Sequence, residues 1–170
     1  MAALDQHWPA FLALVGQAGP TEPLFDFVAG LIGEAIGSKL TTATLFDVPA
    51  GRLRRLYTQN AEAYAVGGYK PIPDNQWTET LIRRQQIYTA LSLEAIAVDF
   101  ADWQLIGSLG CESIANLPIV VGGQTIGAFN LLHEAGYYTP ERLVRVDEVM
   151  PFATMAYLAA VFGERAGSQR

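Results

Sequence analysis

Residues Ser113–His133, SIANLPIVVGGQTIGAFNLLH, decide the fold. Two apolar runs flank Gly122-Gly123, a dipeptide that readily adopts the positive φ angles of a tight hairpin turn. A two-residue turn places Val121 opposite Gln124. The stretch therefore predicts two adjacent antiparallel strands.

A long helix is predicted after the hairpin, from Pro140 to about Gly163. The chain first turns at Gly136, and Thr139 then stands as the N-cap with Pro140 at the first helical position. Pro151 lies inside this helix and predicts a kink, because proline has no amide hydrogen to donate.

Hydrophobic spacing and turn residues predict the remaining elements. We expect helices over Asp5–Gln17, Pro23–Ile36, Trp77–Arg84 and Glu94–Leu109, strands over Leu40–Val48, Arg52–Thr58 and Gln86–Ser92, and an irregular loop over Asn60–Asn75.

The chain resembles a GAF domain over roughly Pro23–Phe162. The resemblance rests on this order of elements and on four motifs: Leu-Pro-Ile, the Gly-Gly turn, Ile-Gly-Ala-Phe-Asn-Leu and Tyr-Thr-Pro-Glu. The resemblance implies an α/β fold of the α+β type, with a profilin-like antiparallel sheet, helices on one face and a ligand pocket on the other. We expect a helical extension at 1–20, the GAF-like domain at 21–165 and a frayed tail at 166–170. GAF domains bind many ligands and a few are enzymes, so the function must be argued from the site.

The composition limits the classes of function. The chain has 170 residues, of which 51% are hydrophobic and 16% charged, which favours one domain that buries apolar surface in a partner as well as in its core. The net charge of −6 argues against a nucleic-acid partner. No uninterrupted apolar run reaches the ~18 residues of a membrane span, and no signal peptide is visible. Because Cys111 is the only cysteine, no intramolecular disulfide can form, and we expect a reducing, cytoplasmic location.

Alternation of side chains assigns the two faces of the hairpin. One face is nearly all apolar and is expected to carry the helices: Ala115, Leu117, Ile119, Val121, Ile126, Ala128 and Leu132. The other has a glycine gap and fits the floor of a small-molecule pocket: Asn116, Pro118, Thr125, Gly127, Phe129 and His133. Alternatively, Asn116 and His133 only satisfy backbone groups at the strand ends. Asn130 falls on the apolar face, where it would need a hydrogen-bond partner.

Aromatic residues in the segments that cover the pocket of GAF domains complete the expected ligand-binding set. This set is Tyr57, Tyr64, Tyr69, Trp77, Trp103, Asn116, Phe129 and His133. In Val66–Pro73, VGGYKPIP, a flexible glycine pair precedes a stiff Lys-Pro-Ile-Pro segment, and Lys70 and Arg55 are candidates for holding an anion. The alternative is a loop packed down by its own aromatic side chains. The sequence does not identify the ligand, and the cofactor is unknown.

Cys111, the only cysteine, is the obvious candidate nucleophile. GAF-fold methionine sulfoxide reductases resolve a sulfenate with further cysteines, so that cycle cannot close here. Glu112 is expected to raise the thiol pKa, which argues against an attached bilin and favours a plain half-buried cysteine. His133 has no second ligand at metal spacing, and the Asn-Lys-X-Phe motif of cyclic-nucleotide GAF domains is missing. No catalytic or metal-binding residue is assigned.

The terminal helices are expected to pair two chains into a homodimer, because they carry more apolar positions than one sheet face can cover. The expected interface residues are Phe11, Leu12, Val15, Val149, Phe152, Leu158 and Phe162. The leading interpretation is a sensory or regulatory GAF-like domain that binds a small organic ligand and signals through the dimer or a separate protein. The alternatives are an enzyme that uses the same pocket and a structural interaction module with a filled pocket.

Overall fold

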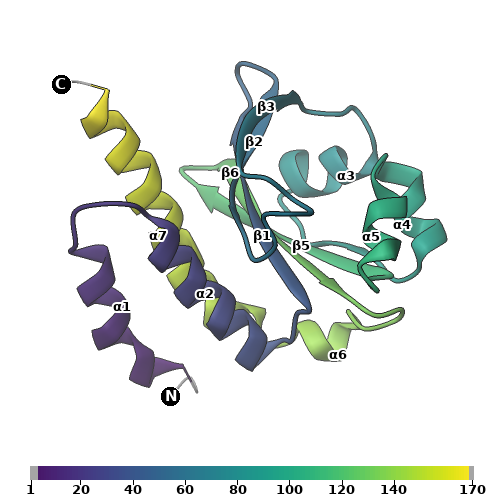
Figure 1. The fold of residues 1–170 in the computed structure, drawn as a ribbon, viewed down its shortest axis with the longest axis horizontal. Helices are drawn as coiled ribbons and strands as arrows, with labels where there is room; N and C mark the ends of the chain where they lie inside the picture. The colour runs from purple at the N-terminus through teal and green to yellow at the C-terminus, as the bar shows by residue number, and fades with distance from the viewer. Residues whose placement is uncertain (1–3, 169–170) are drawn as a thin grey trace.

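A six-stranded antiparallel sheet forms the centre of the protein (Figure 1). The computed structural model describes residues 4–168. The strands are β1 (Leu40–Asp47), β2 (Arg52–Thr58), β3 (Gly67–Pro71), β4 (Tyr88–Ala90), β5 (Ser113–Val121) and β6 (Gln124–His133). Their order across the sheet is β3-β2-β1-β6-β5-β4, so the longest hairpin, β5–β6, and its neighbour β1 occupy the middle.

Helices cover both faces of the sheet (Figure 1). On the first face lie α2 (Glu22–Ala35) and α7 (Val146–Gly167), and α1 (Trp8–Val15) packs against these two helices. On the second face lie α3 (Gln76–Thr78), the π-helical turn η2 (Glu79–Arg83), α4 (Leu93–Asp99) and α5 (Trp103–Ser108). Two short elements, the 3₁₀ turn η1 (Asp5–His7) and α6 (Pro140–Leu143), precede α1 and α7. This arrangement confirms the expected α+β class.

Tyr157 of α7 anchors the helical layer to the sheet. It is fully buried, and its hydroxyl donates to the carbonyl oxygens of Thr44, at 2.9 Å, and Ala128, at 2.7 Å. A Cβ atom on Gly127 would lie 2.2 Å from the Tyr157 ring, so only glycine lets the ring reach the backbone. The glycine gap expected in the pocket floor therefore faces the helices, and Tyr157 fills it.

Trp8 and Phe11 of the N-terminal helix pack against α7 of the same chain. Trp8 stacks on Phe152 with ring centroids 3.9 Å apart, and Phe11 meets the same ring edge-on at 5.2 Å. Phe11, Val149 and Phe152 are consequently buried in the helical layer. Three of the seven expected dimer residues are thus inaccessible to a second copy.

The expected hairpin turn is confirmed. Gly122 and Gly123 have φ angles of 59° and 76°, and Val121 pairs with Gln124. Two residues after Gln124, a β-bulge at Ile126 shifts the register.

From Gly127 onward, the bulge reverses the faces of β6 relative to the sequence-based assignment. A strict two-residue alternation would pair Asn116 with Phe129, but the extra residue makes Leu117 its partner and pairs Asn116 with Asn130. Phe129 therefore packs under the helices against Phe25, with ring centroids 5.7 Å apart. The assignment of Phe129 to the pocket face was wrong, and so was that of Ala128 and Leu132 to the helix face. The β5 assignment holds.

The C-terminal helix is divided, and α7 begins only at Val146. It runs through Pro151 and continues to Gly167, while residues 169–170 of the expected tail lie outside the described range. By length and composition α7 could cross a membrane. In this fold it is a core helix with seven buried residues, Phe152 and Tyr157 among them.

Two other sequence-based expectations differ from the structure. Strand β3 forms inside the predicted loop, and the predicted helix over 94–109 is divided into α4 and α5.

Candidate ligand pocket

A cavity of about 340 Å³ lies on the second face of the sheet. Its floor comes from β1, β5 and β6, and its walls come from β2, β3, α3 and the α4–α5 connection. A second hollow of about 300 Å³ adjoins it and shares Thr44, Leu53, Arg55, Tyr64, Lys70 and Asp102. Each hollow by itself has a volume at the lower end of the ~300–1,000 Å³ range of small-molecule pockets, and the shared residues join them into one candidate site.

A chain of side-chain hydrogen bonds crosses the floor of this pocket. The Trp77 indole N–H donates to Asn116 Oδ1 at 3.1 Å, and Asn116 Nδ2 donates to Asn130 Oδ1 at 2.7 Å. Asn130 Nδ2 then donates to the hydroxyls of Thr42, at 3.1 Å, and Thr44, at 3.0 Å. The chain fixes both amide orientations, because each amide oxygen accepts and each amide nitrogen donates.

The two threonines at the end of this series of hydrogen bonds each have a hydroxyl proton that is free to donate. Both hydroxyls accept from Asn130, and neither donates to a partner within residues 4–168. Both residues line the cavity. An acceptor atom on a bound molecule could therefore accept a hydrogen bond from the hydroxyl of Thr42 or Thr44.

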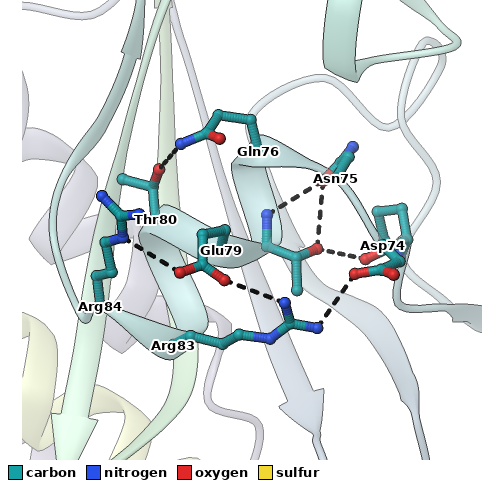
Figure 2. Close-up of polar contacts among 9 residues, drawn as sticks. Asp74, Asn75, Gln76, Glu79, Thr80, Arg83 and Arg84 are labelled. Carbon is teal, nitrogen blue, oxygen red and sulfur yellow. Dashed lines mark hydrogen bonds and ion pairs between the residues drawn. The ribbon is translucent and has the colours of Figure 1, made fainter.

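The segment that carries Trp77 is fixed by its own polar contacts (Figure 2). Asn75 caps α3 by accepting from the Thr78 amide at 3.1 Å, and it donates to the Asp99 carbonyl at 3.0 Å. On the outer side, Arg83 bridges Glu79 and Asp74, as Figure 2 shows. These contacts tie the pocket cover to α4, so the indole has a fixed position above Asn116.

Two cations stand on the β2–β3 side of the pocket. The Arg55 guanidinium lies 4.5 Å from the Tyr64 ring centroid, and its Nη1 donates to the Ala65 carbonyl at 3.3 Å. Its Nε is buried and has no hydrogen-bond partner within residues 4–168. Burial lowers the pKa of Arg55, while Tyr64 and Asp102 partly offset this effect. Lys70 of β3 lines the same wall and is exposed to solvent.

Two carboxylates stand on the opposite side, at the α4–α5 connection. Asp99 accepts from the Tyr88 hydroxyl at 2.8 Å, and Asp102 borders both hollows. Among residues 4–168, no ion pair within 4.0 Å involves Arg55, Lys70, Asp99 or Asp102. Between these charges the wall is apolar, with Phe100 and Ile106 on the cover side.

The structure brings together only part of the residue set that the sequence indicated. Tyr64, Trp77 and Asn116 line the pocket, together with Arg55 and Lys70. Tyr69 and Trp103 lie near it but outside the lining: Tyr69 is 53% exposed and packs beneath Arg52 at 4.0 Å, and Trp103 packs against the core of the second face.

Three expected residues lie away from the pocket. Tyr57 and Phe129 belong to the core under the helices, and the Tyr57 hydroxyl donates to Asp26 of α2 at 2.5 Å. Burial and this carboxylate raise the pKa of Tyr57. His133 stacks on Tyr137 with ring centroids 3.4 Å apart, and its Nδ1 accepts from the Glu134 amide. These positions correct the expected floor of the site.

Sequence reasoning missed Asn130, Thr42 and Thr44. The bulge at Ile126 moved Asn130 to the pocket face, where its demand for partners is met. A period-two pattern in β1, in which Thr42 and Thr44 alternate with Ala43 and Leu45, could have located the two threonines.

Cys111 is buried in the core of the second face and does not line either hollow. Burial raises the pKa of its thiol, which disfavours the reactive thiolate form. Within residues 4–168, no group of three or more His, Cys, Asp or Glu side chains could hold a metal ion.

Solved structures identify the fold. The GAF domain of a two-component sensor histidine kinase from Bacillus halodurans superposes with a TM-score of 0.67 at 12% identity, over 83% of this chain and 96% of that one. The GAF domain of a phosphoenolpyruvate-protein phosphotransferase from Coxiella burnetii gives 0.65 at 16% identity, over 97% and 96%. The chain has the GAF-domain fold. No family model matches its sequence, and no curated protein matches it.

Another similar GAF-fold structure is an enzyme. A free methionine-R-sulfoxide reductase from Neisseria meningitidis, solved with its substrate, superposes with a TM-score of 0.60 at 16% identity, over 93% of this chain and 88% of that one. The GAF fold thus accommodates both sensor modules and a catalyst. At these identities the likeness concerns the fold alone.

Proposed function

We propose that this GAF domain is a sensory or regulatory module that binds a small organic molecule in the pocket over Asn116 and Asn130. The observation that carries the proposal is the cavity of about 340 Å³ with a fixed polar floor and unpaired charged groups in its walls. A cavity of this kind is poorly explained as packing, because Arg55 leaves a buried N–H without a partner. The sensor-kinase origin of a similar GAF structure is consistent with a signalling role.

An enzyme that uses the same pocket is the competing function, and the similar reductase favours it. Cys111 argues against thiol chemistry here, because it is the only cysteine of the chain, it is buried, and it lies outside the pocket lining. We therefore assign no catalytic residue, and Arg55, Asn116, Asn130 and Trp77 act as binding residues.

Native mass spectrometry of the purified chain tests ligand binding. We expect the native mass to exceed the sequence mass, and denaturation to release a small molecule that raises the melting temperature when added back. A ligand-free protein that no fraction of a cell metabolite extract stabilises would favour the filled-pocket structural module. Conversion of an added metabolite during incubation would favour the enzyme.

We further propose that two copies associate through the outer surface of α7. Leu158 and Phe162 are 45% and 75% exposed, one helical turn apart on this helix. Leu12 of α1 is also 50% exposed. A symmetric dimer would remove this apolar surface from water and present the same patch from each chain.

A further inference from the structure

We propose that the ligand of this pocket is a free α-amino acid with an uncharged side chain, its carboxylate held by Arg55 and Lys70 and its ammonium by Asp102 and Asp99. This inference rests on the proposed function and names the class of ligand that the same site takes.

The distribution of charge carries the argument. Arg55 and Lys70 stand on the β2–β3 wall, and Asp99 and Asp102 stand on the α4–α5 wall. The four formal charges cancel, so a simple anion would also face two carboxylates and a simple cation would also face two basic groups. A molecule with both charges satisfies the two walls at once.

Arg55 is the group with the strongest demand for an anion. Its position against Tyr64 fixes the guanidinium, and its buried Nε–H has no acceptor within residues 4–168. A carboxylate is the small anion that fits the planar guanidinium in a two-point contact. Lys70, on the neighbouring strand, adds a second positive charge to the same wall.

Asp102 supplies the opposite charge beside the same space. It borders both hollows, as Arg55 and Lys70 do, and it makes no side-chain hydrogen bond with residues 4–168. Asp99 is partly satisfied by the Tyr88 hydroxyl and still lines the cavity. An ammonium group donates in three directions and can engage both carboxylates.

The uncharged part of the lining of the larger cavity favours an uncharged ligand side chain. Trp77, Phe100, Ile106, Ile114 and Leu132 line it with apolar surface. The hydroxyls of Thr42 and Thr44 line the same cavity, each has a proton free to donate, and both suit a neutral acceptor on the ligand. A charged side chain placed there would lose its hydration without gaining a counter-ion.

The test is calorimetric titration of the full chain, unfolded and refolded to release any bound molecule, with each of the twenty standard L-amino acids. We expect saturable binding of at least one with an uncharged side chain. For that amino acid, the matching carboxylic acid without the amino group and the matching amine without the carboxylate should each bind at least about tenfold more weakly. The inference is overturned if none of the twenty binds, or if the acid or the amine alone binds as tightly.

Substitutions locate the two charges. Arg55→Gln and Asp102→Asn should each raise the dissociation constant about tenfold or more, whereas Arg52→Gln and Asp147→Asn, which lie outside the pocket, should not change it. If Arg55→Gln does not fold, Lys70→Gln tests the same wall, because this side chain is exposed. Equal affinity of the pocket variants and the wild type would also overturn the inference.

The proposed function fails on different evidence. A released molecule that is not an amino acid would contradict the amino-acid inference but would still support the proposed ligand-sensing function. Both the amino-acid inference and the proposed function would be contradicted if the protein binds no amino acid, releases no molecule on denaturation and is stabilised by no metabolite fraction.

Discussion

Arg54 and Arg55 are consecutive residues of β2, yet their guanidinium groups lie on opposite faces of the sheet. Arg54 pairs with Glu164 of α7 on the helical side. Arg55 lies against Tyr64 in the pocket wall. Because side chains alternate along a strand, β2 offers one cation to each layer. The same substitution at the two positions should therefore have different consequences.

Arg54→Gln should change the free energy of unfolding by less than about 1 kcal/mol, because the Arg54–Glu164 pair is partly solvent-exposed. It should leave the dissociation constant of the pocket ligand unchanged, unlike Arg55→Gln. Urea unfolding and calorimetric titration measure the two quantities. Equal losses of affinity in both variants would show that the two faces are not functionally separate.

Gly127→Ala should destabilise the protein by about 3 kcal/mol or more, because its Cβ would lie 2.2 Å from the Tyr157 ring and 2.5 Å from the Thr44 carbonyl oxygen. Gly163→Ala is the matched control in open space on α7, and it should stabilise the helix by roughly 0.5–1 kcal/mol. Chemical denaturation of both variants provides the comparison. A small loss at Gly127 would mean that Tyr157 can move away cheaply.

Asn130→Leu should cost about 1–3 kcal/mol, because it leaves the Asn116 amide and the Thr42 and Thr44 hydroxyls without their partner. In the double variant with Asn116→Leu, the cost should be smaller than the sum of the single costs by at least about 0.5 kcal/mol. A double-mutant cycle from urea unfolding measures this coupling. Strict additivity would show that the hydrogen-bond chain does not act as a unit.

Phe162→Glu and Leu158→Glu should convert the proposed dimer into a folded monomer, because both side chains are exposed on α7. Phe152→Glu should instead unfold the chain, since Phe152 is buried under Trp8. Val98→Glu, at a position on α4 as exposed as Phe162, is the control and should stay dimeric. Light scattering over a dilution series gives the mass. A wild-type mass near 18.4 kDa at every concentration would rule out the dimer.

The fold could be predicted from the sequence because its strongest signals are local. Gly122-Gly123 fixed the turn, and Thr139-Pro140 marked the start of a helix after the hairpin. The faces of β5 followed from simple alternation away from that turn. These features depend only on neighbouring residues, so a single sequence displays them.

The candidate site could be predicted only in part, because one inserted residue decides it. Ile126 forms a bulge with no sequence mark of its own, and it exchanges the positions of Phe129 and Asn130. Local sequence was also insufficient to predict which apolar residues of the terminal helices are exposed. Nothing local distinguishes Phe152, which stacks within the chain, from Phe162, which remains exposed on the same helix.

Thr44 takes part in both layers of the protein. Its hydroxyl ends the polar chain in the pocket floor, and its carbonyl oxygen receives the Tyr157 hydroxyl from the other side of the sheet. A single peptide unit therefore separates the ligand space from the anchor of the C-terminal helix. A ligand that displaces this threonine would also displace the carbonyl oxygen that holds Tyr157, and would thereby shift α7. No loop movement would be needed to transmit this shift across the sheet.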